Sequence, residues 1–400
     1  MNVATPSRDR ARRFALFDYG FRPFFLLAGG FALLAVPAWF LLYRAGLMPL
    51  RGMPGQLWHG HEMLFGFVGA AIAGFMLTAV PSWTGSRGFA GLPLALLVTV
   101  WVAGRAAFAF AAQLPLLVVA AAELAFIPVL LVLVAPPVLR TMNRNVPILV
   151  VLTVIWCLDA AFLWALAHQD ILLAQRVLLV TLGVVLLLIT IIGGRIVPAF
   201  TGNALRARGL DVGLRHRPWI ERFLILAMAS LVAADLLRAP VAVVAAVAGA
   251  AALLHAIRVG GWQTRHTLRD PIVWILHAAY AWLPIGLGLR AVFLLTSHPL
   301  SVHWMHALGS GAAATMILAV MTRASLGHTG RPLLVSRLTA VSYGLLLAAT
   351  AIRVIGPAVL PGAYTAIVAI ASAAWAAAFA LFVWVYTPIL CGPRADGRPG

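Results

Sequence analysis

The chain has 400 residues, of which 63% are hydrophobic and only 10% are charged, and its 29 basic residues outnumber its 11 acidic ones. This composition excludes a soluble globular protein and a disordered one, and it is typical of an integral membrane protein. The formal charge of +18 does not indicate nucleic-acid binding. It is carried by arginines between apolar stretches, where anionic membrane lipids are the expected partners.

Apolar stretches long enough to cross a bilayer recur along the whole chain, so we expect about twelve transmembrane helices. They fall near residues 24–43, 59–80, 92–111, 114–134, 147–167, 172–194, 220–237, 239–257, 272–295, 302–322, 336–355 and 363–386. The predicted protein is therefore an all-α integral membrane protein. It divides into a basic N-terminal segment (1–23), a single membrane domain (24–386) and a short tail (387–400).

The placement of arginine predicts the orientation of these helices. The termini and alternate loops are rich in arginine, whereas the loops on the other side carry Arg44, Arg51 and Arg238. Cytoplasmic loops hold an excess of positive charge, so we expect both termini on the cytoplasmic side of a bacterial inner membrane. A full-length apolar stretch follows the basic segment, so we expect this segment to be retained rather than cleaved as a signal peptide.

Two histidine pairs open two of these spans, on the face opposite the arginine-rich loops. His59 and His61 begin the second predicted helix, and His303 and His306 begin the tenth. Imidazoles are costly in lipid, so four at one depth indicate a buried metal or haem centre. His61 with His306 is the simplest axial pair for one haem iron, and His59 and His303 are candidates for a second metal.

The spacing of the first pair leaves two arrangements open. If His59 and His61 are both helical, their side chains point about 200° apart and serve two neighbouring centres. If His59 lies in the entry turn, both converge on one metal. The alternative to a metal role is an interfacial cluster of histidine and tryptophan that anchors the helix at the headgroups.

Other ionisable residues in the membrane segments are further candidates. Glu62, Glu123 and Asp159 are candidates for a proton route, and a hydrogen-bonded packing role is the alternative. Arg105 and Arg290 approach the outer ends of the third and ninth helices. There they either pair with haem propionates or snorkel to the interface.

Two histidines lie towards the arginine-rich face. His277 and His328 are candidates for a second metal, a second haem or a quinone headgroup, and a packing hydrogen bond is the alternative for His277. The remaining histidines are expected at the surface or at helix ends: His168, His216, His255, His266 and His298.

The ends of the second, sixth and tenth helices resemble one another around Val80, Val197 and Val320. This pattern favours three quasi-repeated arcs of four helices, although helix ends also converge by chance. Haem-copper oxidases have twelve helices in three such arcs, with a low-spin haem between the second and tenth helices. This is an analogy of fold only, and the sixth helix here lacks the histidine of their copper site.

Several motifs together resemble the NnrS family over nearly the whole chain. They include WHGHEMLFGF at 58–67 and GGRIVP at 193–198, with further matches at 20–25, 74–81, 276–282 and 325–332. The resemblance implies a polytopic membrane protein that contains haem and copper and relieves nitrosative stress.

We therefore predict an inner-membrane protein with haem b and copper that protects against nitric oxide or its iron adducts. Quinol is the expected electron donor if the protein is an oxidoreductase, because the chain has no phosphate loop and no dinucleotide fingerprint. A haem held by two histidines is saturated, so direct chemistry needs an open coordination position. The alternatives are a twelve-helix secondary transporter and a membrane sensor without redox chemistry.

Overall fold

The computed structural model describes residues 14–47, 50, 52–210 and 213–398, and this part of the chain contains helices and no strands. In chain order the helices are α1 (Phe21–Arg44), α2 (Gly55–His61), η2 (Glu62–Phe67), α3 (Val68–Thr84), α4 (Leu92–Ala109), α5 (Leu116–Leu124), α6 (Phe126–Arg140), α7 (Val146–Ala167), α8 (Ile171–Ala207), α9 (Pro218–Leu236), α10 (Val241–Gly260), η3 (Thr264–Thr267), α11 (Pro271–Thr296), η4 (Pro299–Ser301), α12 (Trp304–His306), η5 (Ala307–Ala314), α13 (Thr315–His328), α14 (Arg337–Val359), η6 (Pro361–Ala363) and α15 (Tyr364–Cys391). Most of the predicted N-terminal segment, and Arg51, lie outside the described residues.

The described helices form twelve antiparallel crossings, which correspond one to one to the predicted spans. Three crossings are composite: α2–η2–α3, α5–α6 and α12–η5–α13. Eleven have the length and apolar composition of a membrane span. The twelfth, α9, falls short because it carries Glu221, Arg222 and Asp235. The prediction of an all-α, multi-pass membrane protein is confirmed.

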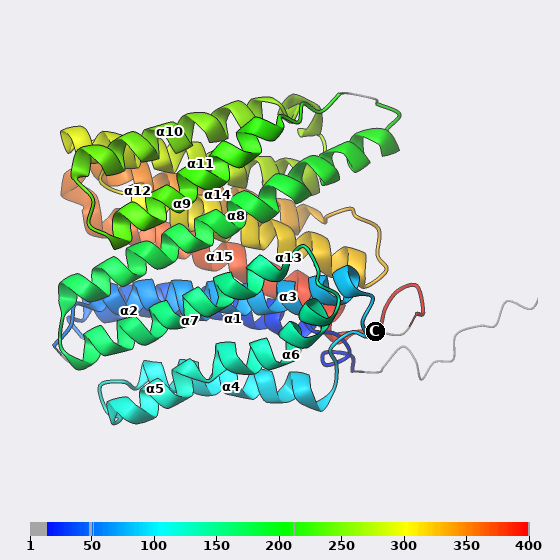
Figure 1. Ribbon diagram of the computed structural model, residues 1–400, viewed down its shortest axis with the longest axis horizontal. Helices are drawn as coiled ribbons and strands as arrows, with labels where there is room; N and C mark the ends of the chain where they lie inside the picture. Colours follow the sequence, from blue (N-terminus) through cyan, green and yellow to red (C-terminus); the bar gives the residue numbers. More distant parts are fainter. Residues whose placement is uncertain (1–13, 48–49, 51, 211–212, 399–400) are drawn as a thin grey trace, which may run out of the picture.

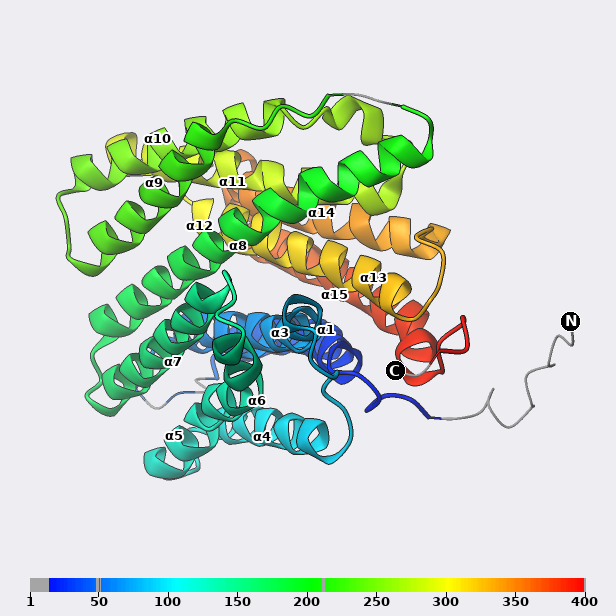
Figure 2. The same ribbon diagram turned by 45° about the vertical axis from the view of Figure 1, so that its right-hand side comes forward.

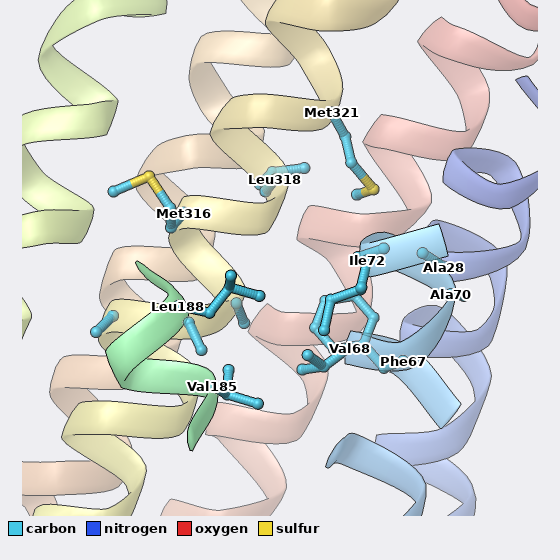
Figure 3. Close-up of a cluster of buried hydrophobic side chains, with 14 of the residues drawn as sticks. Ala28, Phe67, Val68, Ala70, Ile72, Val185, Leu188, Met316, Leu318 and Met321 are labelled. Carbon is cyan, nitrogen blue, oxygen red and sulfur yellow. The ribbon is translucent and has the colours of Figure 1, made fainter. Parts of the chain in front are cut away.

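The second, sixth and tenth crossings lie at the centre of the molecule. In the most apolar stretch of each, 78%, 67% and 67% of the residues are buried, a larger share than in any other span. Side chains of α3, α8 and α13 meet there around Ile72, Leu188 and Leu318 (Figure 3). The arrangement in three quasi-repeated arcs stays a prediction.

The first and last helices pack along each other and close the bundle. Trp375 on α15 donates a hydrogen bond of 2.8 Å to the Ala32 carbonyl on α1. Gly29 allows this approach, because a Cβ there would overlap the ring of Phe382. Arg22 at the start of α1 donates to the carbonyls of Leu390 and Gly392 at the end of α15. The described ends of the chain are thereby held together on the arginine-rich face (Figure 1).

We call the helices before α8 the first half of the molecule and the helices after it the second half. Helix α8 lies between them, because it contacts α7 and η2 on one side and α9, α11 and η5 on the other (Figure 2). The two acidic residues of α9 are paired within the second half. Asp235 forms a bidentate pair with Arg290 of α11, in which Nη1 lies 2.9 Å from Oδ2. Glu221 pairs with Arg258 of α10. These pairs allow a charged helix to lie among apolar ones, because an isolated charge in lipid is costly.

The pair of Asp235 and Arg290 generates a stability prediction. Replacing Asp235 by alanine leaves Arg290 buried without a counter-charge, so we expect the protein to be destabilised by about 3–5 kcal/mol. The measurement is the thermal unfolding midpoint of the detergent-purified protein. Asp396→Ala is the control, because Asp396 pairs with Arg394 in an accessible loop and exposed pairs contribute little. Equal effects of the two substitutions would show that the buried pair has no special role.

Candidate metal centre

A cluster of ionisable side chains surrounds His61 inside the first half of the bundle. Its imidazole Nε2 lies 3.0 Å from Asp159 Oδ1 on α7 and 3.9 Å from Glu123 Oε1 on α5. Nδ1 lies 3.3 Å from Glu62 Oε1 in η2. All four residues are at most 4% exposed. We call His61, Glu62, Glu123, Asp159 and Arg105 the His61 cluster.

Arg105 on α4 completes the cluster by bridging two of its carboxylates. It donates through Nη1 to Glu62 and through Nη2 to Glu123. Two glycines make room for these groups. A Cβ on Gly66 would lie 2.9 Å from Arg105 Nη1, and one on Gly104 would lie 3.1 Å from Glu123 Oε2. The backbone of η2 and α4 is therefore shaped around the charged side chains.

The charges of the His61 cluster do not balance. Three carboxylates face one guanidinium, and a neutral imidazole has only one N–H although both of its nitrogens lie beside carboxylates. An excess of buried negative charge costs several kcal/mol per ion. The cluster therefore requires a further cation, either a proton shared among these groups or a bound metal ion.

The geometry suits a metal ion. His61, Glu123 and Asp159 each offer one ligand atom, and these atoms all lie within 4.8 Å of one another. Glu123 Oε2 is buried without a hydrogen-bond partner in the described structure. Imidazole nitrogen and carboxylate oxygen together bind zinc, iron, manganese and copper(II). The donor set thus fits a metal ion, although it does not select one.

Aromatic rings enclose the His61 imidazole. Phe108 of α4 stacks on it with ring centroids 3.8 Å apart, and Phe65 and Phe162 lie 4.8 Å away. These apolar faces exclude water and fix the ring plane. Electrostatic interactions are stronger in such surroundings than in water.

The other three histidines gather on the opposite side of α2. His306 lies within electrostatic range of His59, His303 and Arg353, and the rings of His303 and His306 are 6.1 Å apart. His59 packs on Trp39 at 4.6 Å, and its Nδ1 is buried without a partner in the described structure. We call His59, His303 and His306 the three-histidine cluster.

The surroundings of the three-histidine cluster fit haem or copper. Imidazole is a ligand of both haem iron and copper. Arg353 of α14 donates to the Tyr364 hydroxyl at 3.3 Å, and its Nη1 is buried without a partner among the described residues. A guanidinium with a free donor is the group that a carboxylate such as a haem propionate would pair with.

Both histidine-bearing spans change their helical geometry directly after the histidines. The π-helix η2 begins after His61, and the π-helix η5 begins after His306. These are the only π-helical segments in the described residues. π-Helical segments are rare in proteins, and many of those that occur lie at functional sites. Both spans therefore depart from regular helical geometry next to the candidate ligands.

The structure groups the four outer histidines differently from the pairing that the sequence favoured. Helix α2 includes both His59 and His61, so their side chains point to opposite sides and join two neighbouring clusters. His61 has carboxylate partners on both ring nitrogens, whereas His306 has His59 and His303 as its histidine neighbours. The structure does not bring His61 and His306 together as an axial pair. The observed grouping corresponds to the alternative in which His59 and His61 serve two neighbouring centres.

The structure places both candidate cofactor arginines in ion pairs. Arg105 belongs to the His61 cluster, and Arg290 pairs with Asp235. Snorkelling is excluded for Arg290, which is 4% exposed. Its guanidinium lies over the ring of Trp304 at 4.7 Å, beside the three-histidine cluster.

The candidates near the arginine-rich face lie in separate surroundings. The His277 ring nitrogens contact the hydroxyls of Thr201 at 2.7 Å and Thr264 at 2.9 Å, which is the packing alternative. His328 packs beside Tyr19 and Phe21. Their proposed roles in binding a metal, haem or quinone remain predictions.

Sequence reasoning missed two residues, one buried and one half-buried. His255 was expected at a helix end or the surface, which is wrong: it is fully buried, and its Nδ1 lies 2.9 Å from the Tyr280 hydroxyl. Arg353 was not singled out. No sequence motif marks either residue, since each is an isolated polar residue near the end of an apolar helix.

These features define a class: a polytopic α-helical membrane protein with buried histidine and carboxylate groups arranged as a metal centre. The chain matches the family model described as NnrS protein over residues 15–394. It therefore belongs to the NnrS family. No curated protein matches the chain.

Substitutions in the His61 cluster test whether it holds a metal. His61→Ala removes a candidate ligand, so we expect the metal of this centre to be lost. Glu62→Gln alters a group that contacts the ligand, so we expect metal affinity to fall about 10–100-fold. The measurement is elemental analysis of the purified full chain. His168→Ala is the control, because His168 is exposed and bonds its own helix, and an unchanged metal content in His61→Ala would contradict the assignment.

Proposed function

We propose that this NnrS-family protein is an inner-membrane haem and copper protein that protects bacteria against nitric oxide and nitrosative stress. The observation that carries the proposal is the pair of adjacent clusters, one of three half-buried imidazoles and one combining a buried imidazole with carboxylates. Their donor sets suit two different metals. Family membership supplies the expectation of haem, copper and nitric oxide.

The two clusters suit different tasks. The three-histidine cluster offers neutral nitrogen donors in apolar surroundings, and Arg353 and Tyr364 lie beside it, so we assign haem b to this side. The His61 cluster offers one nitrogen and several oxygens, so we assign the second metal, copper, to it. When bound, a haem iron supplies nitric oxide binding and electron transfer.

The residues of the His61 cluster are suited to hold and pass a proton. Asp159, His61 and Glu62 are connected through the two imidazole nitrogens. Arg105 holds Glu62 and Glu123 in place by binding both. Reduction of nitric oxide consumes protons as well as electrons, so such a chain suits it. We assign the electrons to membrane quinol, because the chain has no fingerprint for a soluble nucleotide cofactor.

Anaerobic addition of nitric oxide to the reduced, purified protein tests this function. We expect a shift of the haem absorption spectrum, or consumption of the gas with a quinol donor. His306→Ala should remove or convert the haem, because it deletes a candidate axial ligand, whereas His168→Ala should not, because His168 is exposed and bonds its own helix.

The competing functions give other results. A protein with no haem spectrum and no response to nitric oxide would contradict the proposal. If, in addition, an activity were lost only in Glu123→Gln, a proton-coupled transporter would be favoured, because such transporters depend on ionisable groups within the membrane.

A further inference from the structure

A cavity of about 490 Å³ opens between α8, α9 and α10, in the other half of the bundle from the His61 cluster. These helices lie together in Figure 1. A smaller cavity of about 60 Å³ adjoins it and shares Glu221 and Arg258 in its lining. The proposed function uses neither cavity. Both lie where α9 begins and α10 ends, on the arginine-rich face.

Arginines dominate the lining. Arg195, Arg222 and Arg258 border the larger cavity, and Arg215 and Arg217 border the smaller one. His216 also borders the larger cavity. Glu221 is the only acid among the lining residues, and both of its oxygens accept from Arg258. The wall therefore keeps a positive charge after this pair is neutralised.

Arg258 fixes the inner wall of the cavity. It is 5% exposed and donates to the Thr190 carbonyl at 2.8 Å and to the Tyr280 hydroxyl at 2.6 Å, besides Glu221. Gly194 lies against it, since a Cβ there would overlap the guanidinium. Arg258 is thus a positioning residue for Glu221 and the start of α9.

The remaining arginines are available to a ligand. Arg195 donates through Nη1 to Asn145 at 3.0 Å, which orients its guanidinium at the cavity. Arg222 has no carboxylate partner among the described residues and is exposed. A guanidinium presents several donors in one plane and matches the oxygens of a phosphate group.

Part of the remaining lining is apolar. Ile191, Pro198 and Ile225 border the same cavity, and Ile225 is 44% exposed. Ile191 lies four residues deeper than Arg195 on α8, and Ile225 lies three residues deeper than Arg222 on α9. Each arginine therefore has an apolar side chain about 5–6 Å below it on the same helix. The cavity thus offers cations at the membrane surface and apolar side chains below them.

We propose that this cavity binds the phosphate group of an anionic phospholipid in the leaflet of the arginine-rich face. Arg195 and Arg222 hold the phosphate, and Ile191 and Ile225 contact the adjoining lipid chain. Basic pockets between transmembrane helices bind anionic headgroups on this principle. The apolar lower wall distinguishes a lipid phosphate from free phosphate, which would gain nothing from it.

The experiment titrates the delipidated, detergent-solubilised full chain with three probes: phosphatidylglycerol, phosphatidylcholine and inorganic phosphate. A ligand that binds only the folded state raises the thermal unfolding midpoint. We expect phosphatidylglycerol to raise it in a saturable manner and the other two probes to leave it unchanged. In the double variant Arg195→Gln/Arg222→Gln the affinity for phosphatidylglycerol should fall about thirtyfold, since two surface arginines are removed.

The matched control is Arg87→Gln/Arg140→Gln, which removes two exposed arginines from other loops of the same face. It should bind phosphatidylglycerol as the unmodified chain does.

Equal weakening in both double variants would overturn the proposal, because the effect would then be one of net charge. An equal response to inorganic phosphate would overturn the lipid assignment. Arg222→Gln alone, which leaves the Asn145 contact intact, should weaken binding in part. None of these results depends on metal content, so the test is separate from that of the proposed function.

Discussion

The cost of an uncompensated charge in a lipid-surrounded interior shapes this molecule. Outside the His61 cluster, two acidic side chains of α9 are each paired with an arginine from another helix: Asp235 pairs with Arg290, and Glu221 pairs with Arg258. The His61 cluster is the exception, because three carboxylates share one arginine. Because an unpaired carboxylate in the membrane is costly, this excess has a specific reason, and a bound cation supplies it.

The arrangement of the helices brings the groups of the His61 cluster together. Helices α2, α4, α5 and α7 each contribute one member of the His61 cluster, and Phe108 closes over the imidazole. The second, sixth and tenth crossings form the buried centre, so the histidines of the second and tenth spans lie beside each other across the bundle axis. One short helix, α2, serves both clusters because His59 and His61 project from opposite sides of it.

The sequence predicted the membrane class and the twelve long helical segments, eleven of which have the composition of a membrane span, because apolar length is a local property that survives folding. It also identified the residues of the His61 cluster as candidates, since carboxylates and imidazoles inside apolar runs are conspicuous. The sequence could not predict how these residues group. The helix that faces Glu123 is set by contacts between distant segments. The same is true of Arg290, which pairs with Asp235 and does not extend to the membrane–water interface. His255 was misplaced for the same reason, because α11 covers it with Tyr280.

The most direct test of a buried cation beside His61 is X-ray absorption spectroscopy of the metals in the wild-type protein, purified without chelators. We expect a non-haem metal whose coordinating atoms are nitrogen and oxygen and include no sulfur, as His61, Glu123 and Asp159 would provide. A protein without such a metal, or one whose non-haem metal is bound only by imidazoles or by sulfur, would contradict it.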